Sequence, residues 1–298
     1  MTDLAALSAR VKAAFDPLGL LNPGKIVRPS KQDDRALFRF KPGYAAQPLT
    51  TALDWSEWNG FDKAVEMCNN NGHCRKFDAG TMCPSFRVTR EEQHLTRGRA
   101  NTLRLALSGQ LGPDALTSAP VREAMELCVS CKGCKRECPT GVDMAKMKIE
   151  FLHHWHRHHG LTLKERLIAY LPRYAPWAAR LAPLMNVLQN IAKPLLGFAA
   201  QRSLPQWRSD AFPAPAVQPV PGGREVVLFV DTFSTYFEPE NARAAVRVLE
   251  AAGYTVHLPR PVDESRPLCC GRTFLANGLV DEARAEARRM IATLKPYV

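Results

Sequence analysis

Residues 128–139 read CVSCKGCKRECP, with cysteines at intervals of three, three and four residues and a proline after the last of them. This is the bacterial ferredoxin spacing for a 4Fe-4S cluster. Thiolates at three-residue intervals can converge around one corner of a cubane cluster, and the small residues Ser130 and Gly133 permit a close approach of the backbone to the sulfurs. The stretch therefore predicts a 4Fe-4S site that includes Cys128, Cys131 and Cys134.

The fourth ligand should come from elsewhere, because the cysteine before proline in this motif usually binds a different cluster. A second Cys-Pro pair, Cys83-Pro84, supplies it. By the same exchange Cys138 would join Cys68 and Cys74 at a second site, where only three thiolates can be counted. Three interpretations of this second group remain open. It holds a three-iron cluster, it holds a cluster with a non-cysteine ligand such as His73, or it holds no cluster. The cysteines thus predict one 4Fe-4S cluster and leave a second one open.

Other interpretations of the possible metal ligands remain open. The stretch 128–139 could be a zinc site or a set of buried thiols, although zinc usually takes two separated pairs of ligands. Cys269 and Cys270 are adjacent, so their side chains should diverge, and by themselves they could be ordinary buried residues. His154 and His158 would share one face of a helix and could bind a metal, but a polar helix surface is the simpler interpretation.

The composition excludes several classes of protein. A formal charge of +11 arises from 40 Lys and Arg against 29 Asp and Glu, but no nucleic-acid recognition motif accompanies it, so nucleic acid is not expected as a partner. The N-terminus lacks the pattern of a secretory signal, and the apolar stretch 181–192 is too short and too polar to span a bilayer. We expect a cytoplasmic protein, at most peripheral at the inner face of the membrane, with reduced cysteines. No Ser-His-Asp arrangement, Walker loop or dinucleotide-binding fingerprint occurs in the sequence.

The pattern of apolar residues predicts a helical first part and a mixed second part. Helices are expected over residues 4–15, from Thr89 to about Gly109, and over 144–202, where Pro172, Pro176, Pro183 and Pro194 should cut the segment into short helices. Five prolines between 204 and 223 indicate an extended linker. After it, strands at 225–231 and 255–258 flank a helix over 239–252 closed by Gly253, which suggests a parallel βαβ unit. A last helix is expected over 280–294.

Several segments resemble one family, the large bacterial flavin-linked 2-hydroxyacid dehydrogenases that fuse an FAD-binding oxidase unit to an iron-sulfur unit. Residues 15–26, FDPLGLLNPGKI, resemble the end of the FAD-linked oxidase domain, whose flavin-binding body would lie before Met1. Three segments are similar to the family's first cluster region, and residues 128–139 match its second; the three are CNNNGHC at 68–74, MCPS at 82–85 and RGRA at 97–100. Three more look like the start of the cysteine-rich CCG domain of glycolate oxidase and heterodisulfide reductase subunits, namely DTF at 231–233, YFEPE at 236–240 and CCGR at 269–272.

This resemblance implies an α-helical ferredoxin-like cluster domain followed by a partial α/β domain of the CCG type. Residues 1–30 would be the oxidase-domain tail and 55–160 the cluster domain, with a helical connector at 161–203, a proline-rich linker at 204–223 and the partial CCG domain at 224–298. Cys269 and Cys270 would then be functional. The chain would be a fragment, or one piece of a split enzyme.

The function implied by the resemblance is electron transfer. A D-2-hydroxyacid, such as 2-hydroxyglutarate or lactate, would reduce FAD held on an absent or separate domain, and the electrons would pass through the cluster of this chain. Its partners would be the FAD-binding domain or subunit and an acceptor, which could be a quinone, a cytochrome or a soluble carrier. Two alternatives are a non-enzymatic, metal-stapled interaction module and a heterodisulfide-reductase-like subunit.

Overall fold

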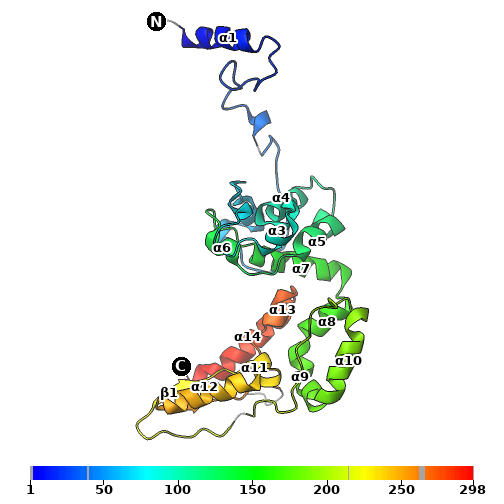
Figure 1. Cartoon of the computed structure of the whole chain (residues 1–298), viewed down its shortest axis with the longest axis vertical. Coiled ribbons are helices and arrows are strands. Elements are labelled where there is room, and N and C mark those ends of the chain that lie inside the picture. The colour runs from blue at the N-terminus through cyan, green and yellow to red at the C-terminus, as the bar shows by residue number, and fades with distance from the viewer. Residues whose placement is uncertain (1–2, 39, 214, 262–265, 298) are drawn as a thin grey trace. The chain divides into compact units, whose positions relative to one another are not determined.

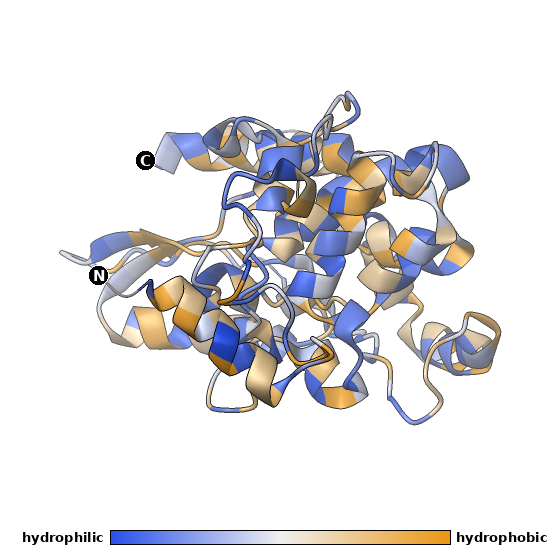
Figure 2. Cartoon of the chain, turned by 90° about the horizontal axis from the view of Figure 1, so that it is seen from above, coloured by the Kyte–Doolittle hydropathy of each residue, from blue (hydrophilic) through white to orange (hydrophobic). Residues whose placement is uncertain are grey.

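The computed structural model describes residues 3–38, 40–213, 215–261 and 266–297. It divides the chain into two compact units, Met1–Gln47 and Pro48–Val298. The second unit consists largely of helices, whereas the described part of the first has one α-helix and one short 3-10 turn, and Figure 1 shows the order of the elements along the chain. Figure 2 shows that most helices carry apolar and polar residues on the same helix, as expected where one side packs and the other meets water.

The first unit contains the predicted N-terminal helix, α1 (Leu4–Phe15). Asp3 caps it, since its side chain accepts a hydrogen bond from the amide of Ala5 at 3.0 Å. Asp16 ends the helix and accepts bonds from Lys12 and from two backbone amides that follow, and these bonds lower the pKa of Asp16 to about 2. A short 3-10 turn, η1 (Arg35–Leu37), follows. The helix predicted over residues 4–15 is confirmed.

The second unit begins with a region of short helices that surrounds the cysteines, here called the cluster region (residues 48–160). Its core joins apolar side chains from many of these helices, including the fully buried Val65, Leu103 and Phe151. The region contains η2 (Ser56–Trp58), α2 (Phe61–Glu66), η3 (His73–Arg75), α3 (Pro84–Thr89), η4 (Glu92–His94), α4 (Thr96–Leu107), η5 (Ala115–Thr117), α5 (Ala119–Glu126), α6 (Gly133–Glu137) and α7 (Met144–His159). Most of these helices are too short to be stable in isolation, so packing must hold them.

The helix predicted to start at Thr89 begins later. Thr89 is instead the last residue of α3, and Arg90 after it has a left-handed backbone (φ 63°) that stops the helix. A 3-10 turn follows before α4 starts at Thr96. The predicted end near Gly109 is close to the observed end at Leu107. The start was wrong because a left-handed residue reverses the chain without leaving a mark in the apolar pattern.

A buried carboxylate ties the entry of this unit to α7. Glu150 is fully buried, and its oxygens accept hydrogen bonds from the amides of Ala52 and Leu53 and from the indole of Trp55 at 2.7 to 2.9 Å. Burial alone would raise the pKa of Glu150, but these bonds and one from His154 outweigh it and lower the pKa. The segment around Trp55 is thereby held against the helix that follows the cysteine motif.

Three helices form the connector: α8 (Leu163–Ala169), α9 (Leu171–Arg180) and α10 (Ala182–Leu195). The prolines that should cut the segment act in two ways. Pro172 and Pro183 stand in the first turn of α9 and α10, where a missing amide hydrogen costs nothing. Pro176 and Pro194 lie inside those helices instead of ending them. The expectation that all four break the helix is therefore wrong for these two.

The C-terminal region (residues 224–297) contains the predicted βαβ unit. Strands β1 (Arg224–Val227) and β2 (Tyr254–His257) pair in parallel, with Val226 opposite Val256. Helix α12 (Pro239–Ala251) connects them and contacts β2, and Figure 1 shows it beside the strands. The first strand is shorter than predicted, because the chain leaves the sheet before α11 (Thr232–Tyr236). After β2 come α13 (Arg272–Ala276), α14 (Val280–Leu294) and η6 (Lys295–Tyr297).

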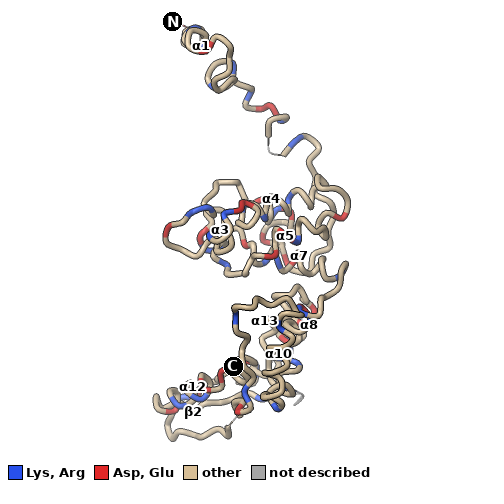
Figure 3. The backbone as a smooth tube through the Cα atoms, turned by 45° about the vertical axis from the view of Figure 1, so that its right-hand side comes forward, with Lys and Arg blue, Asp and Glu red and all other residues tan. Residues whose placement is uncertain are grey.

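The described part of the chain is thus mostly helical, with two parallel strands. The predicted final helix coincides with α14. That this region is of the CCG type stays a prediction. In the part that the structure describes, none of the helices combines the length and the apolar character needed to cross a membrane. Figure 3 shows Lys and Arg scattered along the whole chain, so the positive charge forms no single block.

Candidate iron-sulfur site

Four cysteines from two separate parts of the sequence line one small cavity: Cys83, Cys128, Cys131 and Cys134. Cys83 stands at the N-terminal cap of α3, Cys128 and Cys131 lie in the loop between α5 and α6, and Cys134 is in the first turn of α6. Met82 and Met144 line the same cavity and are buried. The set is the one expected for the first cluster, although its role as ligands stays a prediction.

The loop backbone brings its cysteines around one point. Ser130 (φ 54°) and Lys132 (φ 59°) both adopt the left-handed conformation, so the chain turns after each cysteine. A side chain at Gly133 would come within 3.2 Å of the Met82 amide nitrogen. Glycine therefore allows the loop to pack directly against the segment that carries Cys83.

A carboxylate holds that segment in place. Glu137, at the end of α6, accepts hydrogen bonds from the amides of Thr81 (2.7 Å) and Met82 (3.1 Å). These two bonds are the main reason that the pKa of Glu137 is lowered. Glu137, which is not an expected ligand, thus holds the segment of Cys83 beside the cysteines of residues 128–134.

Arg99 is a functional candidate that the cysteine spacing did not reveal. Its side chain is fully buried on α4, and each guanidinium nitrogen has a partner. Nη1 lies 3.5 Å from Cys83 Sγ, Nη2 donates to Ser85 Oγ at 2.9 Å, and Nε donates to the Ala124 carbonyl at 2.8 Å. A buried cation is expensive unless paired, so its place beside a thiol points to a negative sulfur there. The sequence signal was an arginine within the RGRA segment at 97–100.

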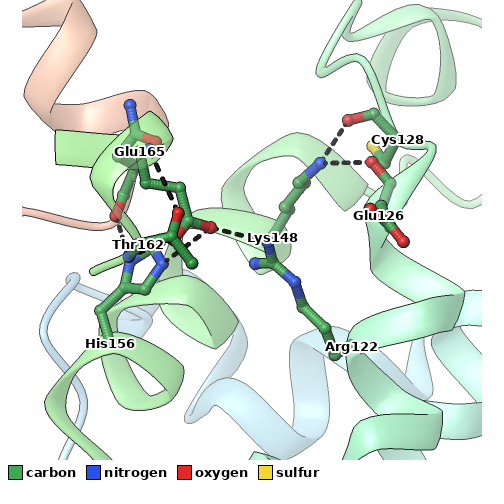
Figure 4. Close-up of polar contacts among 8 residues, drawn as sticks. Arg122, Glu126, Cys128, Lys148, His156, Thr162 and Glu165 are labelled. Atoms are coloured by element: carbon green, nitrogen blue, oxygen red, sulfur yellow. Dashed lines mark hydrogen bonds and ion pairs between the residues drawn. The ribbon is translucent and has the colours of Figure 1, made fainter. Parts of the chain in front are cut away.

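A lysine holds the start of the cysteine loop. Lys148 on α7 donates to the Cys128 carbonyl at 2.6 Å and to the Glu126 carbonyl at 3.2 Å, and Figure 4 shows its ammonium group pointing at both. Burial lowers the pKa of Lys148, and the Cys128 thiol opposes that change. The loop that carries three of the four cysteines is therefore anchored by a cation on a neighbouring helix.

The electrostatics of the cavity suit a positively charged group bound by thiolates. Burial, together with the nearby Cys128, Asp143 and Cys83, raises the pKa of Cys134 to about 11, against the opposing effect of a backbone hydrogen bond from Met144. A buried thiol such as Cys134 needs a nearby cation to become a thiolate, and the iron ions of a cluster provide one. The donor set thus fits a 4Fe-4S cluster. Lys132, which also lines the cavity, and Lys135 approach Asp143 at 3.2 and 3.5 Å.

The second cysteine group is less complete. Cys68 and Cys74 are buried in the core of the cluster region, and Cys68 is near enough to contribute to the raised pKa of Cys74. Burial raises the pKa of Cys74, while the amide and the charge of Arg97 oppose the rise. Cys138 packs against the same core, with its sulfur 3.3 Å from the Thr140 hydroxyl. His73, the suggested non-cysteine ligand, is exposed, and its amide donates to Asn71.

The adjacent pair in the C-terminal region differs from its expected form. Cys269 is buried and Cys270 is exposed, as expected for neighbours, but their thiols still interact. A hydrogen bond from Cys269 lowers the pKa of Cys270 to about 6 and raises that of Cys269. The expectation that these side chains diverge is therefore wrong.

The histidines of α7 bond to protein groups. His154 lies 3.0 Å from Glu150, and His156 lies 2.8 Å from the Asn277 carbonyl and 3.3 Å from Glu165. His158 is exposed. Across the described ranges, no three His, Cys, Asp or Glu side chains are arranged to hold a single metal ion.

Comparison with known proteins bears directly on the cavity. Residues 64–142 match the 4Fe-4S dicluster domain. This span contains every cysteine of both cysteine groups, so both candidate sites lie within the matched domain. No solved structure matches the chain.

Similar proteins extend the match beyond the dicluster domain. The chain is 29% identical to the D-2-hydroxyglutarate dehydrogenase of Pseudomonas putida and 28% identical to that of Escherichia coli, over 87% and 85% of its length. It is 23% identical to the glycolate oxidase iron-sulfur subunit of Escherichia coli, over 80% of its length. The resemblance stated from the sequence is confirmed, and these relatives carry the names of oxidoreductases that act on 2-hydroxyacids.

The matches differ in how much of each relative they cover. The chain spans about 30% of the length of the two D-2-hydroxyglutarate dehydrogenases and 54% of the glycolate oxidase subunit. The shared part includes the dicluster domain, which supports an iron-sulfur region.

Proposed function

We propose that this chain is the iron-sulfur electron-transfer segment of a flavin-dependent D-2-hydroxyacid dehydrogenase. The observation that carries the proposal is the cavity lined by Cys83, Cys128, Cys131 and Cys134 inside the dicluster domain. These residues would hold a 4Fe-4S cluster, which takes up and releases one electron at a time.

The residues around the cavity have distinct roles in this proposal. The guanidinium of Arg99 would stabilise negative charge on the Cys83 sulfur, because the two buried side chains lie at hydrogen-bonding distance. Lys148 and Glu137 would act as positioning residues, since they hold the loop backbone and the Cys83 segment. The buried Met82 and Met144 would limit the access of water on their side of the cavity, while Cys131 is exposed. The exposure of a cluster and the hydrogen bonds to its sulfurs help to set its reduction potential.

The partners follow from the similar proteins. An FAD-binding domain or subunit would deliver the electrons, and residues 15–26 would be the end of that domain. One relative is by name a separate iron-sulfur subunit, which supports a split enzyme as well as a fused one. The substrate would be a D-2-hydroxyacid, with 2-hydroxyglutarate favoured by the names of the relatives. The acceptor would be a quinone, a cytochrome or a soluble carrier, on the cytoplasmic side of the membrane.

The first test is metal analysis of the full chain purified without oxygen. We expect iron and acid-labile sulfide, a brown colour bleached by dithionite, and a reduced-cluster signal in electron paramagnetic resonance (EPR). Photoreduced FAD, added anaerobically, should bleach the protein as dithionite does. Zinc without iron would overturn the proposal in favour of a metal-stapled interaction module.

A pair of variants links the result to the cavity. Cys83→Ser should remove the four-thiolate cluster, whereas Cys270→Ser, at an exposed thiol of the C-terminal region, should leave it in place. Iron retained in Cys83→Ser with an unchanged EPR signal would show that the cluster lies elsewhere.

A further inference from the structure

The two cysteine loops of the dicluster domain share one three-residue register and differ at its middle position. The second loop has the order Cys128, Cys131, Cys134, and the first has Cys at 68 and 74 with Asn71 between them at the same three-residue steps. Each loop is followed by a Cys-Pro pair, at 83–84 and 138–139. Asn71 therefore stands in the register where the second loop has a cysteine.

The backbone shows that this register is a structural one. Asn70 (φ 63°) and Gly72 (φ 79°) are left-handed, as are Ser130 (φ 54°) and Lys132 (φ 59°) at the matching positions. Left-handed residues other than glycine are uncommon, so two alternating pairs at the same offsets indicate one loop design used twice. Both loops then open a helical turn, at η3 (His73–Arg75) and at α6 (Gly133–Glu137).

Burial repeats in the same way. The last cysteine of each loop, Cys74 or Cys134, is buried, and the middle position is exposed in both, as Asn71 and as Cys131. The side-chain oxygen of Asn71 accepts a hydrogen bond from the His73 amide at 2.8 Å. Asn71 thus occupies the middle position of a loop whose geometry is that of a cluster-binding loop.

Helix α4 also serves the two cysteine groups alike. Arg99 places a guanidinium nitrogen 3.5 Å from Cys83, which lines the cavity together with the cysteines of the second loop. Arg97, two residues earlier, interacts with Cys74 and Cys68. Its Nη1 also lies 3.4 Å from the Asn70 carbonyl, so it anchors the first loop. Each cysteine group therefore has its own arginine, and what distinguishes the groups is the residue at the middle position.

We propose that Cys68, Cys74 and Cys138 hold a three-iron cluster in which Asn71 takes the place of the fourth ligand. This rests on the proposed function, because it assumes that the chain binds clusters. Three thiolates can hold three irons, while a neutral amide oxygen is a hard, weak donor beside sulfide-bridged iron. The fourth corner would face solvent at the exposed Asn71 and would not retain its iron. The chain would then carry one four-iron and one three-iron cluster.

The test is the restoration of the missing thiol by Asn71→Cys in the full chain, purified anaerobically and reconstituted with iron and sulfide. The wild type should hold about seven irons and show an EPR signal before reduction, because three ferric ions leave an unpaired spin whereas an oxidised 4Fe-4S cluster is diamagnetic. Asn71→Cys should hold about eight irons, lose the signal of the oxidised protein and gain a second signal after dithionite.

Two further variants make the test specific. Asn69→Cys adds a thiol to the same loop out of register and should behave as the wild type. Cys131→Asn makes the second loop like the first, so it should lower the iron content to about six and add oxidised-state signal. Both middle positions are exposed, so neither change disturbs the core.

The outcomes separate this inference from the proposed function. A wild type with about eight irons and no signal before reduction would overturn the role of Asn71, and so would one with about four irons, yet both would leave electron transfer standing. If the EPR signal of the oxidised protein persists in Asn71→Cys, the signal comes from damage to the four-iron cluster, and the inference is overturned. Zinc without iron would overturn both.

Discussion

The cluster region and the C-terminal region both contain cysteines, but they surround them differently. In the cluster region, thiols from distant parts of the chain meet in one cavity beside the buried cation Arg99. In the C-terminal region two adjacent thiols lie near the carboxylates of Asp231 and Glu286, which oppose ionisation of Cys270 and Cys269 respectively. In the first arrangement several thiols converge on one point, so a cation bound there would stabilise them as thiolates together. The second favours one thiolate paired with one neutral thiol.

Two buried carboxylates, Glu286 in the C-terminal region and Glu150 in the cluster region, are satisfied differently. Glu286 is almost fully buried on α14, and its carboxylate pairs with Arg266 at 2.9 Å on one oxygen and more closely on the other. Glu150 in the cluster region relies on backbone amides and an indole instead. Glu286 therefore has an ionic partner, whereas the hydrogen bonds of Glu150 from two backbone amides and the Trp55 indole come from neutral donors.

The largest expected effect is on iron. Cys134→Ala should remove the four-iron cluster, because Cys134 is one of the four cysteines that line the cavity. Cys269→Ala should leave that cluster unchanged, because Cys269 does not line it. Iron and sulfide per chain, with the visible absorbance, measure this. An equal loss of iron in both variants would end the distinction between the two regions.

The next effect is on stability. Arg99→Ala should lower the free energy of unfolding by about 3 kcal/mol, because it leaves Cys83, Ser85 and the Ala124 carbonyl without their buried partner. Arg97→Ala, at a side chain 23% exposed, should cost under about 1 kcal/mol and serves as the control. Urea unfolding under anaerobic conditions compares them. Equal losses would mean that the buried guanidinium has no special role.

A smaller effect concerns the loss of stability in acid near the contact between the cluster region and the C-terminal region. Burial alone would raise the pKa of Glu165, but bonds from Thr162 and the charges of His156 and Arg122 hold it at about 2 (Figure 4). His156 also binds the Asn277 carbonyl of the C-terminal region. Because the folded pKa lies below the usual 4.5, the stabilisation is present above about pH 4.5 and is lost as the pH falls toward 2.

Removing that carboxylate should remove this part of the acid sensitivity. Glu165→Gln should lower the unfolding free energy by on the order of 2 kcal/mol at pH 6, and the difference from the wild type should shrink as the pH approaches 2. Unfolding curves of both proteins between these pH values measure it. A difference that stays constant with pH would show that packing, not charge, makes Glu165 stabilising.

The smallest effect is on potential. Lys132, Lys135 and Arg136 favour the reduced, more negative cluster, so replacing all three with glutamine should lower the potential, by about 10 to 40 mV. The shift is small because the three side chains are exposed and two of them face Asp143. Protein-film voltammetry measures it, with Arg288→Gln on α14 as a charge control. An upward shift would contradict the expected sign.

Local patterns predicted much of the chain. The helices at 4–15 and 280–294, the parallel strand pair and the likeness to 2-hydroxyacid dehydrogenases could all be inferred from the sequence. The grouping of Cys83 with the later cysteines was predicted because the cysteine before proline in this motif usually binds a different cluster. The start of α4 could not be found, because Arg90 stops α3 by its backbone conformation and not by its hydrophobicity.

By itself, the sequence determined which residues could be ligands and how the backbone turns between them, because both depend on neighbours a few positions apart. Only the tertiary structure decided what surrounds the sulfurs. Arg99 meets Cys83 across 16 positions, Lys148 meets the Cys128 carbonyl across 20, and Glu137 meets Thr81 across 56. Such contacts depend on how helices pack. No periodicity encodes them, since packing joins residues whose separation along the chain is arbitrary.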